Sequence, residues 1–193
     1  FSVQADYSNG DVAINTYKEN FKGHISFVKV GKEGEMDLAF QIVTPGVNFD
    51  LSHAGKGKSH GWFFFSCYNT EQANTLLEVN ASQKDKDFIM AVNWKKAEEY
   101  IKAGKGKKVP VKYAHNVFDE KTHTATSEIK KEVLVLNTKE LKDICYFIPC
   151  PKSPHGCDVD PTGEYIVGSG KLAALIPVFS FDKIQSAIRS EER

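Results

Sequence analysis

Two stretches of the chain follow the same pattern of turns and strands, and this repeat constrains the fold more than any other feature. Residues 41–69, QIVTPGVNFDLSHAGKGKSHGWFFFSCYN, align with residues 148–171, IPCPKSPHGCDVDPTGEYIVGSGK. Each stretch has a strand, a proline-containing turn, a second strand, a turn with Asx and glycine, and a strand led by an aromatic residue. A strand unit repeated with such turns is typical of β-propeller blades. We therefore expect an all-β fold, a fragment of a β-propeller with short helices between strands.

Strand signals account for most of the remaining chain. Short runs of β-branched and aromatic residues, bounded by turn residues, predict strands. These runs cover residues 24–30, 38–44, 61–68, 87–93, 132–137, 144–150, 164–169 and 175–181. Helical segments are too few, and alternate too irregularly with strands, for a parallel sheet built from βαβ units.

Two helices are predicted, each directly after a strand. Asn93 can cap a helix over about residues 94–103 that Gly104 ends, and Asp182 can cap a second helix over about residues 183–190. The polar stretch at about 104–131 shows no clear periodicity. We expect an irregular insertion within a blade there, and a solvated loop for its basic run KAGKGKKVPVKY.

The overall charge and hydropathy exclude some classes of partner. The chain carries 25 lysines and arginines against 25 aspartates and glutamates, so its formal net charge is zero. A nucleic-acid-binding face needs a basic surplus, so no nucleic acid is expected as a partner. No apolar run approaches the roughly 20 residues that cross a bilayer, so no membrane span is expected. The chain begins with Phe1 and not with methionine, which predicts that it derives from a longer protein.

His155 is the first candidate for a chemical role, because the backbone around it is constrained. Pro154 fixes its own φ, and Gly156 lets another group come close. The imidazole therefore lies on a fixed backbone at the start of a strand, at the mouth of the expected propeller channel. It is either a metal ligand that meets equivalents from other blades or a histidine satisfied in a tight turn, and composition alone favours the turn. Of the other histidines, His53 and His60 lie among glycine, lysine and serine and are expected to be exposed.

The cysteines match neither a common zinc spacing nor a dense disulfide framework. The chain has four of them, Cys67, Cys145, Cys150 and Cys157. The favoured interpretation is that they are free and act as small hydrophobic residues within strands. A tetrahedral zinc site formed by the last three with His155 is the alternative.

Oxygen-bearing side chains follow the predicted strand 61–68. Tyr68 and Glu71 leave this strand together, and Asp85 and Asp87 come later in the same loop. A carboxylate with a phenol or carbonyl oxygens can bind a hard cation such as calcium. A polar loop exposed to solvent is the alternative.

Several of these stretches together resemble nitrous-oxide reductase. The resemblance is carried by FIPCPKSPHGCDVDPTGEYIVGSGKL with PVFSFDKI after it, by FDLSHAGKGKSHGWFFFSCYNTEQA and by FIMAVNWKKAEEYIKAG. It extends over most of the chain, from about residue 24 to residue 188. The cysteine-rich sequence around His155 is closer to the divergent branch of the family than to its best-known branch.

The resemblance implies a periplasmic copper enzyme of denitrification that reduces nitrous oxide to dinitrogen and water. In this family a seven-bladed N-terminal propeller holds a four-copper sulfide cluster on histidines. A C-terminal cupredoxin domain holds the copper site through which electrons enter from a cytochrome or cupredoxin donor, and the enzyme is a homodimer. Residues 1–193 would form the middle of the propeller, about two blades with strands of their neighbours, without the cupredoxin domain.

The resemblance also implies site residues. His155 matches the cluster histidine of the family's P-H-G motif, and no protein residue is implied as a nucleophile. The family's calcium ligands beside the cluster match Tyr68, Glu71, Val79 through its backbone carbonyl, Asp87 and Ser153. Asp85 competes with Asp87 because this loop carries two extra residues, and Ser153 stands where the family often has asparagine.

With one cluster ligand and no electron-entry domain, this chain alone is predicted to be inactive. The alternative function is a non-catalytic β-propeller interaction module in which His155 is a turn residue. The full reading frame separates the two, because the enzyme needs further cluster histidines on both sides and a downstream segment with paired cysteines.

Overall fold

The computed structural model describes residues 2–6, 11–16, 22–33, 36–47, 49–67, 87–119 and 124–191. The described strands are β1 Ser2–Asp6, β2 Asp11–Thr16, β3 Lys22–Val30, β4 Met36–Pro45, β5 Ser52–Ala54, β6 Trp62–Cys67, β7 Phe88–Asn93, β8 Lys107–Asp119, β9 Thr124–Asn137, β10 Cys145–Pro149, β11 Pro154–Val159, β12 Tyr165–Gly170 and β13 Val178–Ser180. The described helices are α2 Trp94–Lys102 and α3 Phe181–Glu191, with 3-10 turns η1 Gly57–Ser59 and η3 Lys142–Ile144. The expected all-β fold with short helices between strands is confirmed.

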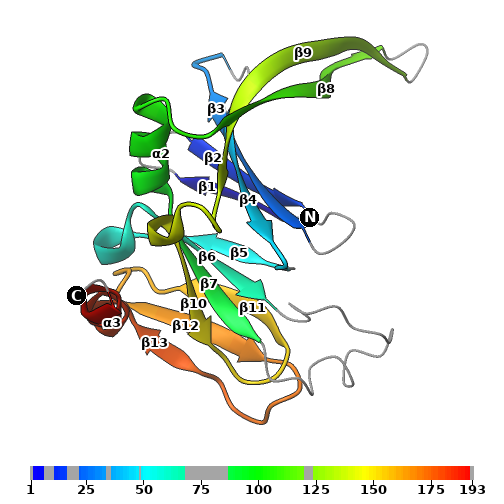
Figure 1. Ribbon diagram of the computed structural model, residues 1–193. Coiled ribbons are helices and arrows are strands. Elements are labelled where there is room, and N and C mark those ends of the chain that lie inside the picture. Colours follow the sequence, from blue (N-terminus) through cyan, green and yellow to red (C-terminus); the bar gives the residue numbers. More distant parts are fainter. Residues whose placement is uncertain are drawn as a thin grey trace.

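The strands form three neighbouring sheets (Figure 1). Their strand orders are β1-β2-β3-β4-β9-β8, β5-β6-β7-β10 and β11-β12-β13. The described pairs are antiparallel, except that β9 runs parallel to β4. Each sheet begins with an edge strand, and β5 contacts both β1 and β11. We call these three adjoining edge strands the hub. Sheets that extend outward from adjoining first strands form a propeller-like arrangement, as the repeat predicts.

The middle sheet is buried on both faces, which explains its aromatic strand β6. Phe63 and Phe65 pack in one apolar core with residues of the first sheet. Trp62 and Phe64 pack in a second core with residues of the third sheet and α3. A strand with cores on both faces needs no alternation of apolar and polar residues. The continuous run of WFFFSC therefore marks the layer between two blades.

The two helices begin and end for local reasons. The Asn93 side chain accepts a hydrogen bond from the N–H of Lys96 at 3.1 Å, so this predicted cap of α2 is confirmed. Gly104 follows the helix with a φ of 72°, a left-handed conformation that suits glycine after a helix. The predicted cap Asp182 is wrong, because α3 already begins at Phe181. The Phe181 N–H donates to a carbonyl outside the helix, so the helix begins without Asp182 as its cap.

The turn between β11 and β12 shows how the repeated Asx and glycine pattern acts. Asp160 accepts hydrogen bonds from the Thr162 hydroxyl at 2.6 Å and from the Tyr165 N–H at 2.9 Å. The hydrogen bond from the Thr162 side chain stabilises the ionised carboxylate and lowers the pKa of Asp160 to about 2, and hydrogen bonds from backbone N–H groups add to this effect. Gly163 closes the turn at a φ of 73° and donates its N–H to the Asp160 carbonyl. This turn lies against the turn that precedes β6, because the Lys58 N–H donates to the Thr162 carbonyl at 3.1 Å.

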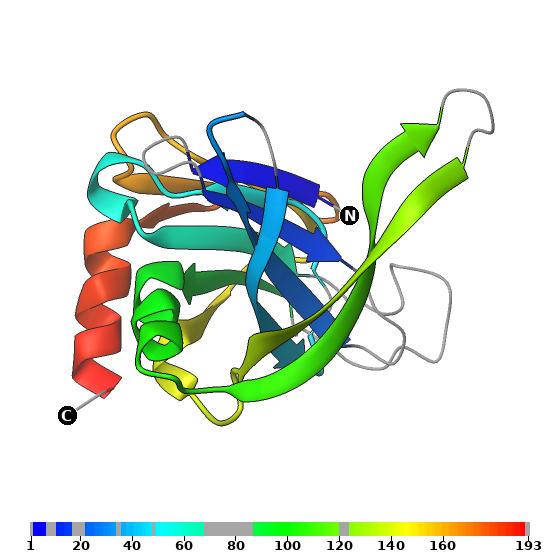
Figure 2. The same ribbon diagram turned by 90° about the horizontal axis from the view of Figure 1, so that it is seen from above.

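Part of the stretch predicted as an irregular insertion is instead a long antiparallel hairpin. Strands β8 and β9 pair from Lys107 with Val135 to Asp119 with Thr124. Figures 1 and 2 show the far end of this hairpin extending well beyond the other strands of the three sheets. The basic run KAGKGKKVPVKY, residues 102–113, is therefore a loop only over residues 103–106 and continues as strand β8 from Lys107. Valine and tyrosine favour extended backbone, and cross-strand pairing stabilises it although the composition is polar.

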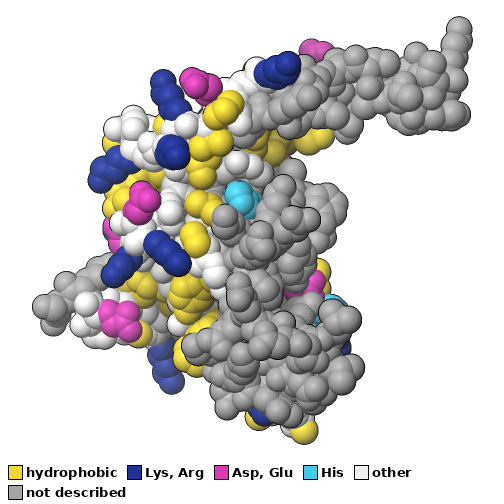
Figure 3. Space-filling view, turned by 45° about the vertical axis from the view of Figure 1, so that its right-hand side comes forward, with side chains coloured by type: hydrophobic (Ala, Val, Ile, Leu, Met, Phe, Trp, Pro, Cys, Tyr) yellow, Lys and Arg dark blue, Asp and Glu magenta, His cyan; other side chains and the backbone are white. Residues whose placement is uncertain are grey.

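The described surface mixes both signs of charge (Figure 3). Several lysines lie next to carboxylates, with contacts of 2.8 Å from Lys96 to Asp143 and 2.6 Å from Lys131 to Asp37. In the part of the chain that the structure describes, neither α2 nor α3 has the length and apolar character needed to cross a lipid bilayer.

Candidate metal site at the hub

His155 is the second residue of β11 and lies on the hub. Its side chain is 57% exposed, and its Nδ1 atom lies 2.6 Å from Oδ2 of Asp50, whose side chain is 17% exposed. Asp50 precedes β5, so this contact joins the third sheet to the second. A carboxylate next to Nδ1 favours the tautomer with its proton on Nδ1, which leaves the Nε2 lone pair for a ligand. Histidines that bind metals usually donate this ring N–H in a hydrogen bond, whereas here Nδ1 and Oδ2 are in ion-pair contact without the geometry of a standard hydrogen bond.

The backbone next to His155 contains a bulge. The pairing of β11 with β12 changes register between Pro154 and Cys157. The Ser169 hydroxyl accepts a hydrogen bond from the Gly156 N–H at 2.6 Å and donates one to the Gly156 carbonyl at 3.3 Å. A bulge changes the direction of the side chains beside it. Ser169 therefore helps to keep His155 in its orientation toward Asp50.

Asp87 and Ser153, two of the predicted calcium ligands, lie together. Asp87 directly precedes β7 and is 5% exposed, and its Oδ2 atom accepts a hydrogen bond from the Ser153 N–H at 2.7 Å. Ser153 is fully buried with a φ of 55°, a left-handed conformation that is uncommon outside glycine. Such strain persists where surrounding contacts impose it, often at ligand sites. Because Ser153 is two residues before His155, this pair is anchored beside the candidate metal ligand.

The donor types of these residues fit the implied metals. Carboxylate oxygen is the ligand that calcium prefers, and the Ser153 N–H holds the Asp87 carboxylate in one orientation. An imidazole held by a carboxylate suits copper. The other predicted calcium ligands lie outside the described residues: Tyr68, Glu71 and Val79, together with the competing Asp85.

The expectation that His53 and His60 are simply exposed is wrong. His53 is the middle residue of β5, and its side chain is 21% exposed. Its Nδ1 atom lies 3.0 Å from Oδ1 of Asp158 on the neighbouring strand β11. His60 packs edge-on against Trp94, with ring centroids 5.8 Å apart. The glycine and lysine around both residues suggested a loop, but β5 pairs with β6 and places His53 on the hub.

The four cysteines are free thiols, three of them buried. Burial raises the pKa of Cys145 to about 12, and burial together with the Asp87 carboxylate raises the pKa of Cys150 to about 11. Thiols with such pKa values stay protonated at neutral pH, whereas metals bind the thiolate. No three His, Cys, Asp or Glu side chains converge on a metal position within the described residues. The interpretation of the cysteines as small hydrophobic residues within strands is confirmed for Cys67, Cys145 and Cys157, whereas Cys150 follows β10 and is half-buried. The described residues do not support the zinc alternative.

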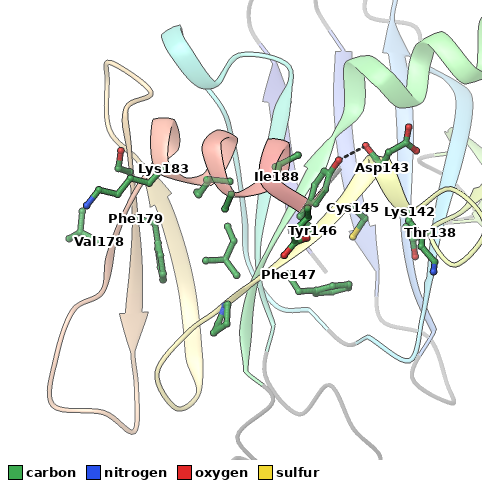
Figure 4. A pocket seen from close by; sticks show the side chains of 16 residues that line it. Thr138, Lys142, Asp143, Cys145, Tyr146, Phe147, Val178, Phe179, Lys183 and Ile188 are labelled. Atoms are coloured by element: carbon green, nitrogen blue, oxygen red, sulfur yellow. Dashed lines mark hydrogen bonds between the residues drawn. The ribbon is translucent and has the colours of Figure 1, made fainter. Parts of the chain in front are cut away.

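A groove of about 900 Å³ lies away from the hub, between β10 and the side formed by β13 and α3 (Figure 4). Tyr146, Phe147, Phe179 and Ile188 contribute apolar surface to it. In the part of the chain that the structure describes, β13 pairs with β12 alone, so the groove lies beside an open sheet edge. The residues predicted to bind copper or calcium are not among those that line it, whereas Cys145 of the zinc alternative is.

Asp50 is the hub residue that sequence analysis missed. It is one of many carboxylates in the chain, and nothing in its local pattern distinguishes it. Aligning the two repeats predicts equivalent strands in neighbouring blades, and equivalent strands of a propeller adjoin at its axis. The alignment of the two repeats could therefore have predicted that the residues before β5 lie close in space to those of β11.

Comparison with known proteins supports the sequence resemblance. No family model matches the chain. The chain is similar to nitrous-oxide reductase of Pseudomonas fluorescens, with 29% identity over 157 residues that cover 78% of this chain and 20% of that protein. It is also similar to nitrous-oxide reductase of Stutzerimonas stutzeri, with 26% identity over 153 residues that cover 77% of this chain and 20% of that protein. The chain thus has a distant relation to nitrous-oxide reductase and spans about one fifth of the length of these curated relatives.

Proposed function

We propose that this chain is part of a copper-dependent nitrous-oxide reductase. In this proposal it forms the middle of the N-terminal seven-bladed propeller, about two blades with strands of their neighbours, in the divergent branch of the family. The whole protein would be a periplasmic homodimer of denitrification that receives electrons from a cytochrome or cupredoxin. The observation that carries the proposal is the 2.6 Å contact between Nδ1 of His155, in the P-H-G stretch, and the carboxylate of Asp50 before β5.

The residues of this chain would bind and orient, while the metal cluster carries the redox chemistry. His155 would bind one copper through Nε2, and Asp50 would hold the proton on Nδ1, so that the ring keeps one tautomer and one orientation. Ser169 would fix the bulge behind it. When bound, a four-copper sulfide cluster supplies the site and the electrons for converting nitrous oxide, with two electrons and two protons, into dinitrogen and water. Asp87 and Ser153, with Tyr68, Glu71 and Val79, would hold calcium beside it.

The full-length gene product tests this proposal directly. Anaerobically purified protein, loaded with copper and given a viologen reductant, is expected to consume nitrous oxide and to release dinitrogen in equal amounts. The 193-residue chain under the same conditions is expected to be inactive. A full-length product that binds no copper and consumes no nitrous oxide would favour the alternative, a propeller module for protein interaction.

A separate prediction concerns the calcium content of variants at two of the proposed calcium ligands, Glu71 and Asp87. Replacing Glu71 with Gln, or Asp87 with Asn, in the full-length gene product is expected to lower calcium affinity at least about tenfold. Each change removes a negative ligand but keeps an oxygen, and the amide oxygen introduced by Asp87→Asn could still accept from the Ser153 N–H. Elemental analysis after dialysis against a chelator measures the effect.

Asp37→Asn is the matched control for the calcium measurement. Asp37 has a 66% exposed side chain and contacts Lys131 on the hairpin, away from the hub. Its replacement is expected to leave calcium unchanged. Unchanged calcium in the Glu71 and Asp87 variants as well would exclude both residues as ligands.

A further inference from the structure

The middle and third sheets share a helix as well as their strand pattern. In the middle sheet α2 begins directly after the third strand, β7, and in the third sheet α3 begins directly after the third strand, β13. Both helices present apolar side chains to a core from their first, fourth and eighth residues. These residues are Trp94, Ala97 and Ile101 of α2, and Phe181, Ile184 and Ile188 of α3. The two helices are therefore equivalent elements of neighbouring blades.

The connection that follows α2 covers the outer edge of the preceding sheet. Strand β4 is the fourth strand of the first sheet, and β9 pairs in parallel with it, from Phe40 with Leu134 to Val43 with Asn137. Leu136 of β9 is fully buried in the same core as the apolar residues of α2. This core is thus completed by a strand that comes after the helix of the next blade.

The groove beside β10 lies at the equivalent place in the next blade. Strand β10 is the fourth strand of the middle sheet, and within the described residues it pairs with β7 alone. Tyr146 and Phe147 of β10 lie on one side of the groove, and Phe179 and Lys183 lie on the other (Figure 4). The groove therefore occupies the position beside β10 and α3 that β9 occupies beside β4 and α2.

The side chains of β10 are also less buried than their counterparts on β4. Phe40 and Ile42 of β4 are at most 5% exposed in the first core, whereas Tyr146 and Ile148 of β10 are only partly buried in the second. Folded proteins usually cover an open strand edge and an apolar surface of this kind. Glu191, the last residue of α3, lines the groove, so the helix ends beside it.

We propose that a β-strand of the same polypeptide, from the connection that follows α3 in the full-length gene product, occupies this groove. The strand pairs in parallel with β10 and inserts an apolar side chain toward α3, as Leu136 does toward α2. The inference rests on the proposed function only in taking the chain as part of a longer protein. The curated relatives are long enough for such a connection, because this chain spans about one fifth of their length.

Photochemical cross-linking of the full-length gene product identifies the occupant. Phe147 is 42% exposed and lines the groove, so p-benzoyl-phenylalanine can replace it. Illumination is expected to link this position to the connection directly after α3, beyond residue 193 of the same polypeptide. A mixture of isotope-labelled and unlabelled protein separates links within a chain from links between copies. The matched control has the same photo-reactive residue at Leu51, which is also 42% exposed but lies at the hub, and should give no link to that connection.

Amide hydrogen exchange in the same protein tests the strand pairing. Successive residues of an edge strand direct their N–H groups alternately toward the neighbouring strand and away from it. If a strand pairs with β10, its groove-facing amides should exchange within about tenfold of the rate of those that face β7. Groove-facing amides that exchange more than about tenfold faster would mean an open edge and would contradict the proposal.

The cross-linked partner decides between the possible occupants. A link to the connection after α3 supports the proposal, whereas a link to a second copy or to another domain contradicts it, and so does the absence of any link. If the Phe147 variant does not fold by circular dichroism, the photo-reactive residue is placed at Lys183, which is exposed on the opposite side of the groove. Neither measurement depends on copper. A full-length product that forms the link but consumes no nitrous oxide would retain this inference and contradict the proposed function.

Discussion

Replacing His155 with alanine in the full-length gene product is expected to deplete the proposed copper cluster and to abolish nitrous-oxide reduction. Loss of a carboxylate behind a metal-binding histidine typically lowers metal affinity about 10- to 100-fold, so loss of the imidazole itself should lower it by at least about 100-fold. Copper in the cupredoxin domain should remain, because that site lies elsewhere in the proposed enzyme. Copper per chain, the visible spectrum and the rate of nitrous-oxide consumption are measured together.

The fold is expected to tolerate this change. The His155 side chain is 57% exposed, and substitutions at exposed positions usually change the free energy of unfolding by about 0.5 kcal/mol or less. Asp50→Asn gives a graded comparison, because it keeps the imidazole and removes the negative charge next to Nδ1. It is expected to retain part of the copper and to bind it more weakly. A His155→Ala protein with full cluster copper and full activity would show that His155 is only a turn residue.

The features that sequence predicted are those encoded within a few neighbouring residues. The aromatic run of β6, the Asn93 cap and the turn from Asp160 to Gly163 each follow from local pattern, and the structure contains all three. The repeat extends this local information to the whole arrangement, because equivalent segments must occupy equivalent places in neighbouring blades. The propeller-like order of sheets was therefore predictable without any knowledge of long-range contacts.

The features that sequence missed depend on contacts between distant segments. Strand β8 and residues 124–131 of β9 are polar, and their extended conformation comes from pairing with each other; residues 132–137 of β9, which pair with β4, were predicted as a strand. Asp50 and His53 gain their contacts with β11 only because β5 lies beside that strand. Phe181 begins α3 one residue before the predicted cap, and it packs edge-on against Trp62 and Phe64 of another sheet. Local propensity cannot report such partners, and tertiary packing overrides it.

Gly163→Ala is expected to produce a large loss of stability without touching the proposed metal site. Gly163 has a φ of 73°, and a Cβ atom there would overlap the backbone carbonyl oxygen of Lys56. The left-handed conformation costs about 1–2 kcal/mol for a residue with a side chain. Crowding against a backbone that cannot move freely adds about 1–3 kcal/mol. A total of about 3 kcal/mol should lower the melting temperature of the 193-residue chain by about 6–12 °C.

Gly104→Ala separates the two contributions to this loss. Gly104 has a φ of 72°, almost the same as Gly163, but a Cβ atom there would meet nothing within 4 Å. Its replacement should therefore carry only the conformational cost, about 1–2 kcal/mol, and lower the melting temperature by about 2–8 °C. The difference between the variants measures how tightly the turn before β12 is held against the turn before β6. Equal melting temperatures for the two variants would mean that these turns are not in contact in solution, and that the second and third sheets are joined more loosely than the Lys58 N–H to Thr162 carbonyl hydrogen bond implies.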